Sequence, residues 1–292
     1  VYRGVTQDVR LCGESPSVTS ECRPMRVAVY PVVFLLTASL VASADLDPVV
    51  ADLKSKDAKV RLKAVESLGA AGKDAAPFLR QLCDATMDPN PKVVAAALQA
   101  VGKVEPKLAK PLSDLVIPSN VKTTVPVASL GADAVGSLRA DGRPAAGVML
   151  AVLKAEMGKG EKANSATTRS MLAALANVGA DDEATVKTCG AILGTNGVPT
   201  THRTFAMAYF AAMIQEKAER FGAAKGYIEA AIAAPETQFS TRVIVSVGTM
   251  GSTAAPLLPA LERAKLSQDP VIRRAAFDAA ARIVKDRDAK KE

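Results

Sequence analysis

Aromatic side chains are scarce in this sequence. They make up 4% of the 292 residues and tryptophan is absent, while 49% of the residues are hydrophobic. A core of this composition must be built mainly from Ala, Leu and Val. Small aliphatic side chains let helices approach one another closely and suit a β-sandwich poorly. The composition therefore predicts an all-α fold.

Residues that carry chemistry are also few. His202 is the only histidine, so the chain cannot contain an H-E-x-x-H motif or a histidine cage for a metal. We expect His202 to lie on the surface near the start of a helix. The Gly-Lys-Gly run at 158–160 lacks the spacing of a phosphate-binding loop, and no G-x-S-x-G elbow occurs. The sequence thus predicts no catalytic residue, no metal ligand and no cofactor, and we expect a protein that is not an enzyme.

The charge is mildly basic, with a formal net charge of +7. The helices expected to form the second of each pair carry both signs, which gives a mixed surface instead of the basic stripe that binds nucleic acid. Without tryptophan, stacking on bases is also limited. We therefore expect no nucleic-acid partner. The charged residues on those helices are Arg80, Lys107, Lys110, Lys154, Lys187, Lys225, Arg263 and Lys265, with Asp84, Asp114, Glu156, Glu183, Glu229 and Glu262.

Residues 25–44 have the pattern of a secretory signal peptide. Arg23 and Arg26 supply the positive charge, 27–40 is an uncharged apolar stretch, and Ala-Ser-Ala at 42–44 matches an A-x-A cleavage site. The apolar stretch is short for a membrane span. We predict an exported protein, periplasmic or secreted, with no integral membrane span after cleavage.

We interpret residues 1–24 as an over-extended, disordered N-terminus in front of a start at Met25. Two of the four cysteines fall in that stretch, so the mature chain keeps Cys83 and Cys189. In a repeat array each unit contacts only its neighbours, so we expect these thiols to be too far apart to bridge. Both are predicted to be small buried apolar residues.

One sequence pattern occurs three times, at 57–69, 90–102 and 269–281. Each copy begins with Asp or Asn, whose side chain can accept a hydrogen bond from the first backbone N–H groups of a helix. Apolar residues then follow at i, i+4, i+5 and i+8, which places them on one helical stripe. Gly69 and Gly102 are expected to end their helices in the left-handed conformation.

A second pattern, at 72–82 and 251–261, predicts the other helix of each unit. Both copies contain A-A-P-x-L, and both are followed by an Asp-Pro pair that opens the next unit. Such helical hairpins have apolar faces that need stacked neighbours, which is the condition for a solenoid.

The combined pattern, D-P-x-V-R-x-x-A…L-G followed by A-x-P-x-L-x-x-L, resembles the short HEAT-like repeats of phycobilisome lyases. The resemblance implies an α-solenoid of about six HEAT-like hairpins over 45–285. With the signal peptide at 25–44, the chain is interpreted as an exported bacterial protein with HEAT-like repeats. It is clear at 46–116 and 237–285 and extends to 165–234.

The stretch 117–164 departs from the repeat. Helices are expected there at 120–131 and 141–157, but Gly136, Gly142 and Pro144 interrupt the period. At the other end, 286–292 is predicted to be a charged, solvated tail that caps the last repeat.

For function, the sequence favours an exported, non-enzymatic scaffold that binds a protein. The bilin-lyase resemblance leaves a lyase-like protein that handles a small molecule as one alternative, and a HEAT-like nucleic-acid-binding protein as another. The partner, the residues that bind it, the biological process and the oligomeric state stay open. Phe78, Tyr209, Phe210 and Tyr227 are candidate apolar anchors, although we expect each to pack in the helical core.

Overall fold

The computed structural model describes residues 46–116, 127–195, 197–216 and 218–290. The predicted signal peptide and the segment before it lie outside these residues. Within the described ranges the chain forms fourteen α-helices and five 3₁₀ segments and contains no β-strand. The prediction of an all-α solenoid is confirmed.

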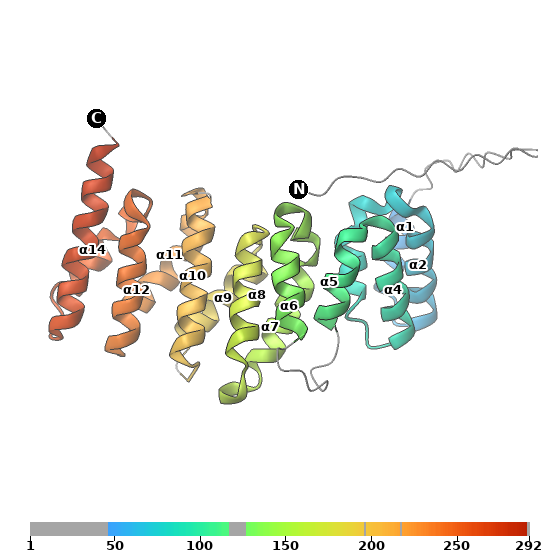
Figure 1. The fold of residues 1–292 in the computed structure, drawn as a ribbon, viewed down its shortest axis with the longest axis horizontal. Helices are drawn as coiled ribbons and strands as arrows, with labels where there is room; N and C mark the ends of the chain where they lie inside the picture. Colours follow the sequence, from blue (N-terminus) through green and yellow to red (C-terminus); the bar gives the residue numbers. More distant parts are fainter. Residues whose placement is uncertain (1–45, 117–126, 196, 217, 291–292) are drawn as a thin grey trace, which may run out of the picture. The chain divides into compact units, whose positions relative to one another are not determined.

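Seven helices of one layer follow one another in chain order across the described part of the molecule (Figure 1). They are α2 (Ala58–Ala71), α4 (Pro91–Val104), α6 (Val127–Ser137), α8 (Ser165–Asn177), α10 (Thr200–Glu216), α12 (Thr237–Thr249) and α14 (Pro270–Ala289).

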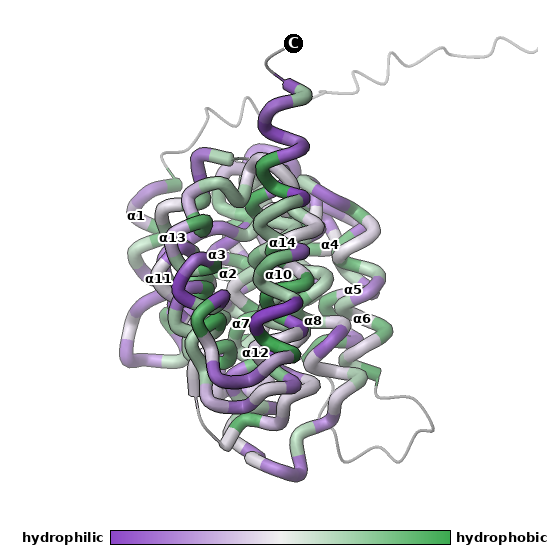
Figure 2. The backbone as a smooth tube through the Cα atoms, turned by 90° about the vertical axis from the view of Figure 1, so that its left-hand side faces the viewer, coloured by the Kyte–Doolittle hydropathy of each residue, from purple (hydrophilic) through white to green (hydrophobic). Residues whose placement is uncertain are grey.

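A second layer lies behind the first. The end-on view in Figure 2 places α11 and α13 on one side and α5, α6 and α8 on the other. The second-layer helices are α1 (Asp47–Asp52), α3 (Leu79–Ala85), α7 (Ala146–Met157), α9 (Glu183–Gly194), α11 (Phe221–Ile232) and α13 (Leu258–Ala264). Their buried Leu, Val, Ile and Ala side chains fill the space between the layers.

The predicted helix starts are confirmed. The Asp57 side chain accepts a hydrogen bond from the Lys59 N–H, the Asn90 side chain from the Lys92 N–H, and the Asp269 side chain from the backbone of α14. These caps satisfy backbone donors that have no partner inside the helix.

Gly69 and Gly102 do not end their helices, which corrects the prediction. Both lie inside helices, since α2 runs on to Ala71 and α4 to Val104. A Cβ at Gly69 would lie 2.9 Å from the Cβ of Ala100 in α4. Gly136 and Gly248 make the same close approach to an alanine of the next first-layer helix. The recurrent glycine therefore sets the spacing between helices.

The middle of the chain is more regular than the sequence indicates. The 3₁₀ segments η1 (Gly72–Phe78), η2 (Arg139–Ala145) and η5 (Gly251–Leu257) all carry proline at their sixth position. Their first residues have φ of 57°, 54° and 60°. Because the residue that needs positive φ is Arg139 instead of glycine, the turn is hidden in the sequence. Residues 127–157 form a repeat hairpin. The first predicted helix runs to Ser137 instead of 131, and its predicted start at 120 lies outside the described residues, while the second ends at Met157 as predicted.

Helix α5 (Pro106–Val116) departs from the pattern in the opposite way. It was expected in the second layer, but it lies between α4 and α6 in the first (Figure 1). Pro111 and Leu115 are close enough to α6 that a Cβ at Gly131 would collide with their backbone. In the second layer α3 therefore contacts η2 and α7 directly.

The last helix is longer than its repeat. It continues to Ala289, so most of the charged stretch predicted as a tail is helical. Figure 2 shows this end of α14 as mostly hydrophilic. Asp286 joins it to η5 by accepting a 2.7 Å hydrogen bond from the Ser252 N–H.

Candidate functional site

The four candidate aromatic anchors pack in or against the hydrophobic core, as expected. Tyr209 and Phe210 are fully buried, and the Tyr209 hydroxyl donates a 2.6 Å hydrogen bond to the Ala180 carbonyl. Tyr227 stacks on Phe210 with ring centroids 6.0 Å apart, and Phe78 is half-buried against the core. None of them is a free contact surface.

His202 is buried, so its predicted surface position was wrong. It lies near the start of α10 as expected, but only 1% of it is exposed, and its Nε2 is 3.0 Å from the Ser165 Oγ of α8. Burial lowers the pKa of the imidazole, which favours the neutral ring. The residue belongs to a contact between repeats, where it links the starts of two neighbouring helices.

Both cysteines are buried and free, as predicted. Burial raises the pKa of the Cys83 thiol to about 12 and also raises the pKa of the Cys189 thiol. Neither thiol is therefore a reactive thiolate at neutral pH.

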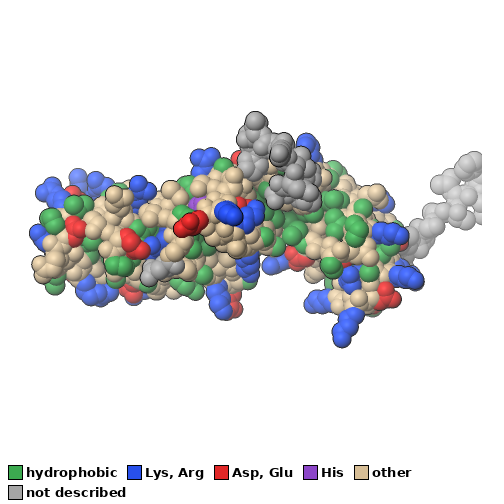
Figure 3. Space-filling model, turned by 90° about the horizontal axis from the view of Figure 1, so that it is seen from below, with side chains coloured by type: hydrophobic (Ala, Val, Ile, Leu, Met, Phe, Trp, Pro, Cys, Tyr) green, Lys and Arg blue, Asp and Glu red, His purple; other side chains and the backbone are tan. Residues whose placement is uncertain are grey.

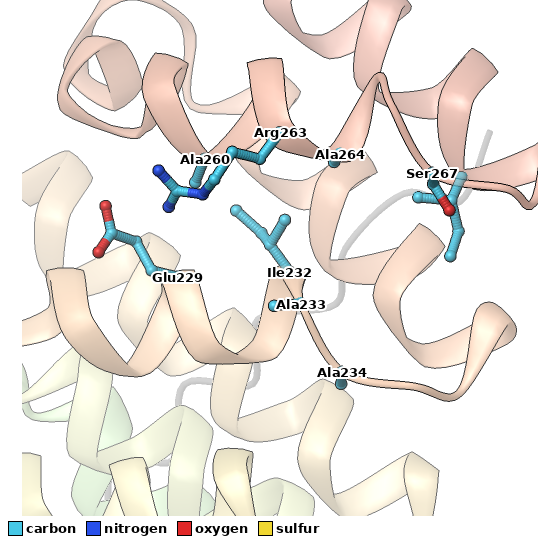
Figure 4. Close-up of a pocket in the computed structure, with 9 residues that line it drawn as sticks. Glu229, Ile232, Ala233, Ala234, Ala260, Arg263, Ala264 and Ser267 are labelled. Atoms are coloured by element: carbon cyan, nitrogen blue, oxygen red, sulfur yellow. The ribbon is translucent and has the colours of Figure 1, made fainter.

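An apolar groove opens in the second layer between α11, α13 and the start of α14. Its volume is about 290 Å³. Figure 4 shows Ile232 between the two second-layer helices, with the Arg263 guanidinium and the Glu229 carboxylate on the same side of the groove. Alanines complete the floor, and Leu266, which follows α13 directly, is 81% exposed. The groove thus combines an apolar floor with a charged rim.

The same groove recurs at the other end of the array. There it lies between α1, α3 and the start of α4 and has a volume of about 220 Å³. Counted from the helix starts at Asn90 and Asp269, five of the lining positions are equivalent. Met87 also lines this groove, and its equivalent Leu266 is exposed next to Ser267, which lines the other. The equivalent pairs in the two grooves are Gln81 and Ala260, Asp84 and Arg263, Ala85 and Ala264, Asp88 and Ser267, and Val93 and Ile272.

The two grooves differ in the charge of their rims. Asp84 stands where the other groove has Arg263, and partial burial raises the pKa of the Asp84 carboxyl. Asp88 is held by two hydrogen bonds from Arg61, of 2.6 and 2.9 Å, which lower its pKa. The side-chain oxygen of Gln81 is buried and accepts no hydrogen bond within the described residues. Lys54 and Arg61 line the first groove with these two acids, and Glu229 lines the second with Arg263, so the grooves differ in which charge stands at each position and not in net charge.

A third, polar hollow of about 440 Å³ lies where η2 meets the ends of α8 and α10. Arg220 pairs there with Asp181 at 2.8 Å and with Glu216 at 2.9 Å, and Arg143 also pairs with Asp181. Because these charges are matched inside the fold, we interpret this hollow as a set of links between repeats.

Charge does not gather on the face drawn in Figure 3, where Lys and Arg side chains are interspersed with Asp and Glu. Within the described residues, no three His, Cys, Asp or Glu side chains come together in a way that could hold a metal ion. In the same residues, no helix has the length and apolar character needed to cross a membrane.

The fold and its grooves define a helical-repeat protein. No family model matches the chain, and no curated protein matches it. Among solved structures it is similar to an engineered protein, with 14% identity, a TM-score of 0.33, and coverage of 83% of this chain and 97% of that one. It is also similar to the complex of CpcE and CpcF of phycocyanin lyase from Nostoc sp. PCC7120. That match has 16% identity and a TM-score of 0.32 and covers 84% of this chain and 94% of that one.

The sequence did not identify the grooves, although part of the signal was present. Met87 and Leu266 are large apolar residues at the same place in two repeats, just before the Asp or Asn that opens the next helix. Such a position is normally polar. Only the packing of the second layer shows that a groove lies beside each of them.

Proposed function

We propose that this chain is an exported, non-enzymatic scaffold of HEAT-like repeats that binds a protein partner along its second helix layer. The observation that carries the proposal is the recurrence of one groove, with equivalent lining, at α1/α3/α4 and at α11/α13/α14. A repeat array provides such grooves preformed, so little ordering entropy is lost when a partner binds.

The form of the grooves favours a protein over a small molecule. At about 220 and 290 Å³ they lie below the usual range for small-molecule sites, roughly 300–1,000 Å³. An apolar floor with a charged rim is the anatomy of a protein interface. Each groove is also flanked by an exposed apolar side chain, Met87 at 43% and Leu266 at 81% exposure. Those side chains can be covered by a surface larger than the groove itself.

Charges of both signs border each groove, Lys54 and Asp84 in the first and Glu229 and Arg263 in the second. A partner must therefore present charges of both signs around its apolar contact, and a segment with like charges at these places is rejected.

A site-specific crosslinking experiment tests this function. A photo-crosslinking amino acid is placed at Met87, at Leu266, or at Ala95, an exposed residue of α4 in the first layer. The purified 45–292 chain is added to the exported fraction and irradiated. We expect the same partner band from the Met87 and Leu266 positions and none from the Ala95 position.

A groove-filling variant makes the test specific. Ala264→Phe occupies the second groove, and Ala95→Phe is the matched control with the same change in size. Crosslinking from Leu266 should fall at least tenfold in Ala264→Phe and stay unchanged in Ala95→Phe. Equal crosslinking from all three positions, or none from either groove, would refute the proposal.

A further inference from the structure

Among the described residues, α14 is the last helix of the first layer, and no other described helix covers its outer face (Figure 1). Three arginines show what this layer places against such a face. Arg61, Arg203 and Arg273 stand at the same place in their helices, each with its backbone N–H bonded to the residue four positions earlier. Two of them lie inside the array, and the third lies at its end.

Inside the array this arginine binds an acid of the next repeat. Arg61 uses its Nη1 to donate to the carbonyls of Ser55 and Lys56, at 2.8 and 3.1 Å. Its Nε and Nη2 together bind the Asp88 carboxylate at 2.6 and 2.9 Å. Asp88 lies just before α4, the helix that covers α2.

Arg203 makes the equivalent link further along. Its Nη1 donates a 3.0 Å hydrogen bond to Glu236, the residue that opens α12. The helix that covers this arginine therefore also begins with a carboxylate. The first layer thus joins neighbouring helices by an arginine in one and an acid at the start of the next.

Arg273 makes the hydrogen bonds to its own turn but, in the described part of the chain, has no bound carboxylate from a next helix. Its Nη1 donates to the carbonyls of Ser267 and Gln268 at 2.7 and 2.8 Å, as Arg61 does in its own turn. Its Nε and Nη2 edge, which in Arg61 holds the carboxylate, makes no hydrogen bond to an acid among the described residues, although the charge of Arg273 acts on Asp269, the cap of its own helix. This edge is a fixed, planar pair of donors, the geometry that binds a carboxylate in a bidentate way.

The apolar part of the interface is also in place. Phe277 is 56% exposed, whereas Val65, its equivalent in α2, is fully buried. Ala281 is exposed too, and it stands where α2 has Gly69; because alanine adds a Cβ there, a covering helix must carry glycine at the place that Ala100 takes in α4. The outer face of α14 therefore has the parts of an inter-repeat contact without the helix that would cover it.

The charge of the face indicates the partner. Arg274, Arg282 and Lys285 are exposed beside Phe277, and of these only Arg274 is paired, with Asp278 at 3.1 Å, among the described residues. We propose that the outer face of α14 binds an acidic α-helix of another protein, with a carboxylate at the start of that helix on Arg273 and its apolar stripe on Phe277. The inference rests on the proposed function in that both involve a protein partner, but it concerns a different surface.

A second copy of this chain is a poor occupant. The helix it would offer is α2, at the other end of the first layer. The outer face of α2 carries Lys63, four residues before Ser67, the equivalent of Ala100 in the α2–α4 contact. Lys59 lies on the same side, one turn earlier, and both lysines are exposed. Two basic faces repel each other, so the partner is an acidic helix from a different protein.

A helical probe tests the inference. The probe is a stapled, fluorescent peptide with the sequence of 86–104, which contains Asp88 and the covering helix α4. Lys92→Glu and Lys103→Glu make it acidic, and Ala100→Gly leaves room for the Cβ of Ala281. Binding to the 45–292 protein is followed by fluorescence anisotropy. We expect saturable binding, at least tenfold weaker for a probe that also carries Asp88→Asn.

Protein variants locate the binding site. Arg273→Gln should raise the Kd at least tenfold, and it should add little to the loss caused by Asp88→Asn in the probe, since the two groups bind each other. Arg273 also donates hydrogen bonds to the turn between α13 and α14, so its replacement could disturb the fold. Phe277→Ala changes an exposed side chain instead, and it should raise the Kd several-fold. Arg242→Gln, the same change of charge at an exposed residue of α12, should leave the Kd unchanged.

The outcomes separate this surface from the groove. Equal losses for Arg242→Gln and Arg273→Gln, or equal binding of the probes with and without Asp88→Asn, would overturn the inference. So would a concentration-dependent dimer in sedimentation velocity that Phe277→Ala dissociates. If Ala264→Phe abolishes crosslinking from Leu266 and leaves probe binding intact, the two surfaces act independently.

Discussion

The close approach of first-layer helices gives the sharpest test of the packing. In Gly69→Ala, the new Cβ would lie 2.9 Å from the Cβ of Ala100 and 3.1 Å from its Cα. Ordinary carbon contacts are about 3.5–4.0 Å, so α2 and α4 must separate by roughly 0.5–1 Å. Overpacking of this kind lowers the free energy of unfolding by about 1–3 kcal/mol. Replacing glycine by alanine inside a helix raises it by about 1 kcal/mol.

The matched control is Gly226→Ala in α11, where an added Cβ meets nothing within 4 Å. It gains the same helix propensity without a clash, so it should stabilise the protein by about 1 kcal/mol. The two variants should therefore differ in free energy of unfolding by about 1–3 kcal/mol, with Gly69→Ala the less stable. Urea denaturation with equal m-values measures this difference. If Gly69→Ala proves as stable as Gly226→Ala, the helices are not in close contact at this position and the packing argument fails.

Three further predictions concern the turns and the buried groups. The backbone of Ser252 holds the pKa of Asp286 down to about 2; its stabilising effect is present above the unfolded pKa of about 4 and disappears as pH falls through about 2. Melting temperatures of wild type and Asp286→Asn should therefore differ at pH 6 and converge near pH 2, and a constant difference would contradict this linkage. Arg139→Gly should raise stability by about 1 kcal/mol in urea titrations, because Arg139 has a φ of 54° where two equivalent turns use glycine; a loss would mean that the arginine side chain contributes more than the strain costs. Cys83 and Cys189 should react with a thiol reagent only at the rate of unfolding, and fast labelling of the native protein would show that the second layer is open there.

The sequence predicted those parts of the fold that depend on local chemistry. Asp57, Asn90 and Asp269 cap helices as expected because a side-chain oxygen next to the first backbone N–H groups acts within a few residues. The apolar stripes that follow them also form the core. The sequence predicted two helices in the middle of the chain but treated the stretch as irregular, because Arg139 occupies the turn position where the two equivalent turns have glycine.

The candidate site could be predicted much less well. Arg263 and Glu229 were identified only as charges on second-layer helices, and nothing local shows that they border one groove. The equivalence of Asp88 and Ser267, and of Arg61 and Arg273, becomes meaningful only when the neighbouring helix is known to be present in one case and absent in the other.

The sequence alone determined that the chain is a stack of paired helices, because caps, turns and apolar periodicity act over a few residues and repeat along the chain. Tertiary structure decided the rest. In the tertiary structure α5 lies in the first layer and His202 is buried between two repeats. Gly69, expected to end its helix, instead lies where α2 contacts α4. Each of these outcomes depends on which surface a neighbouring helix offers, and such complementarity in space is not written in any single segment.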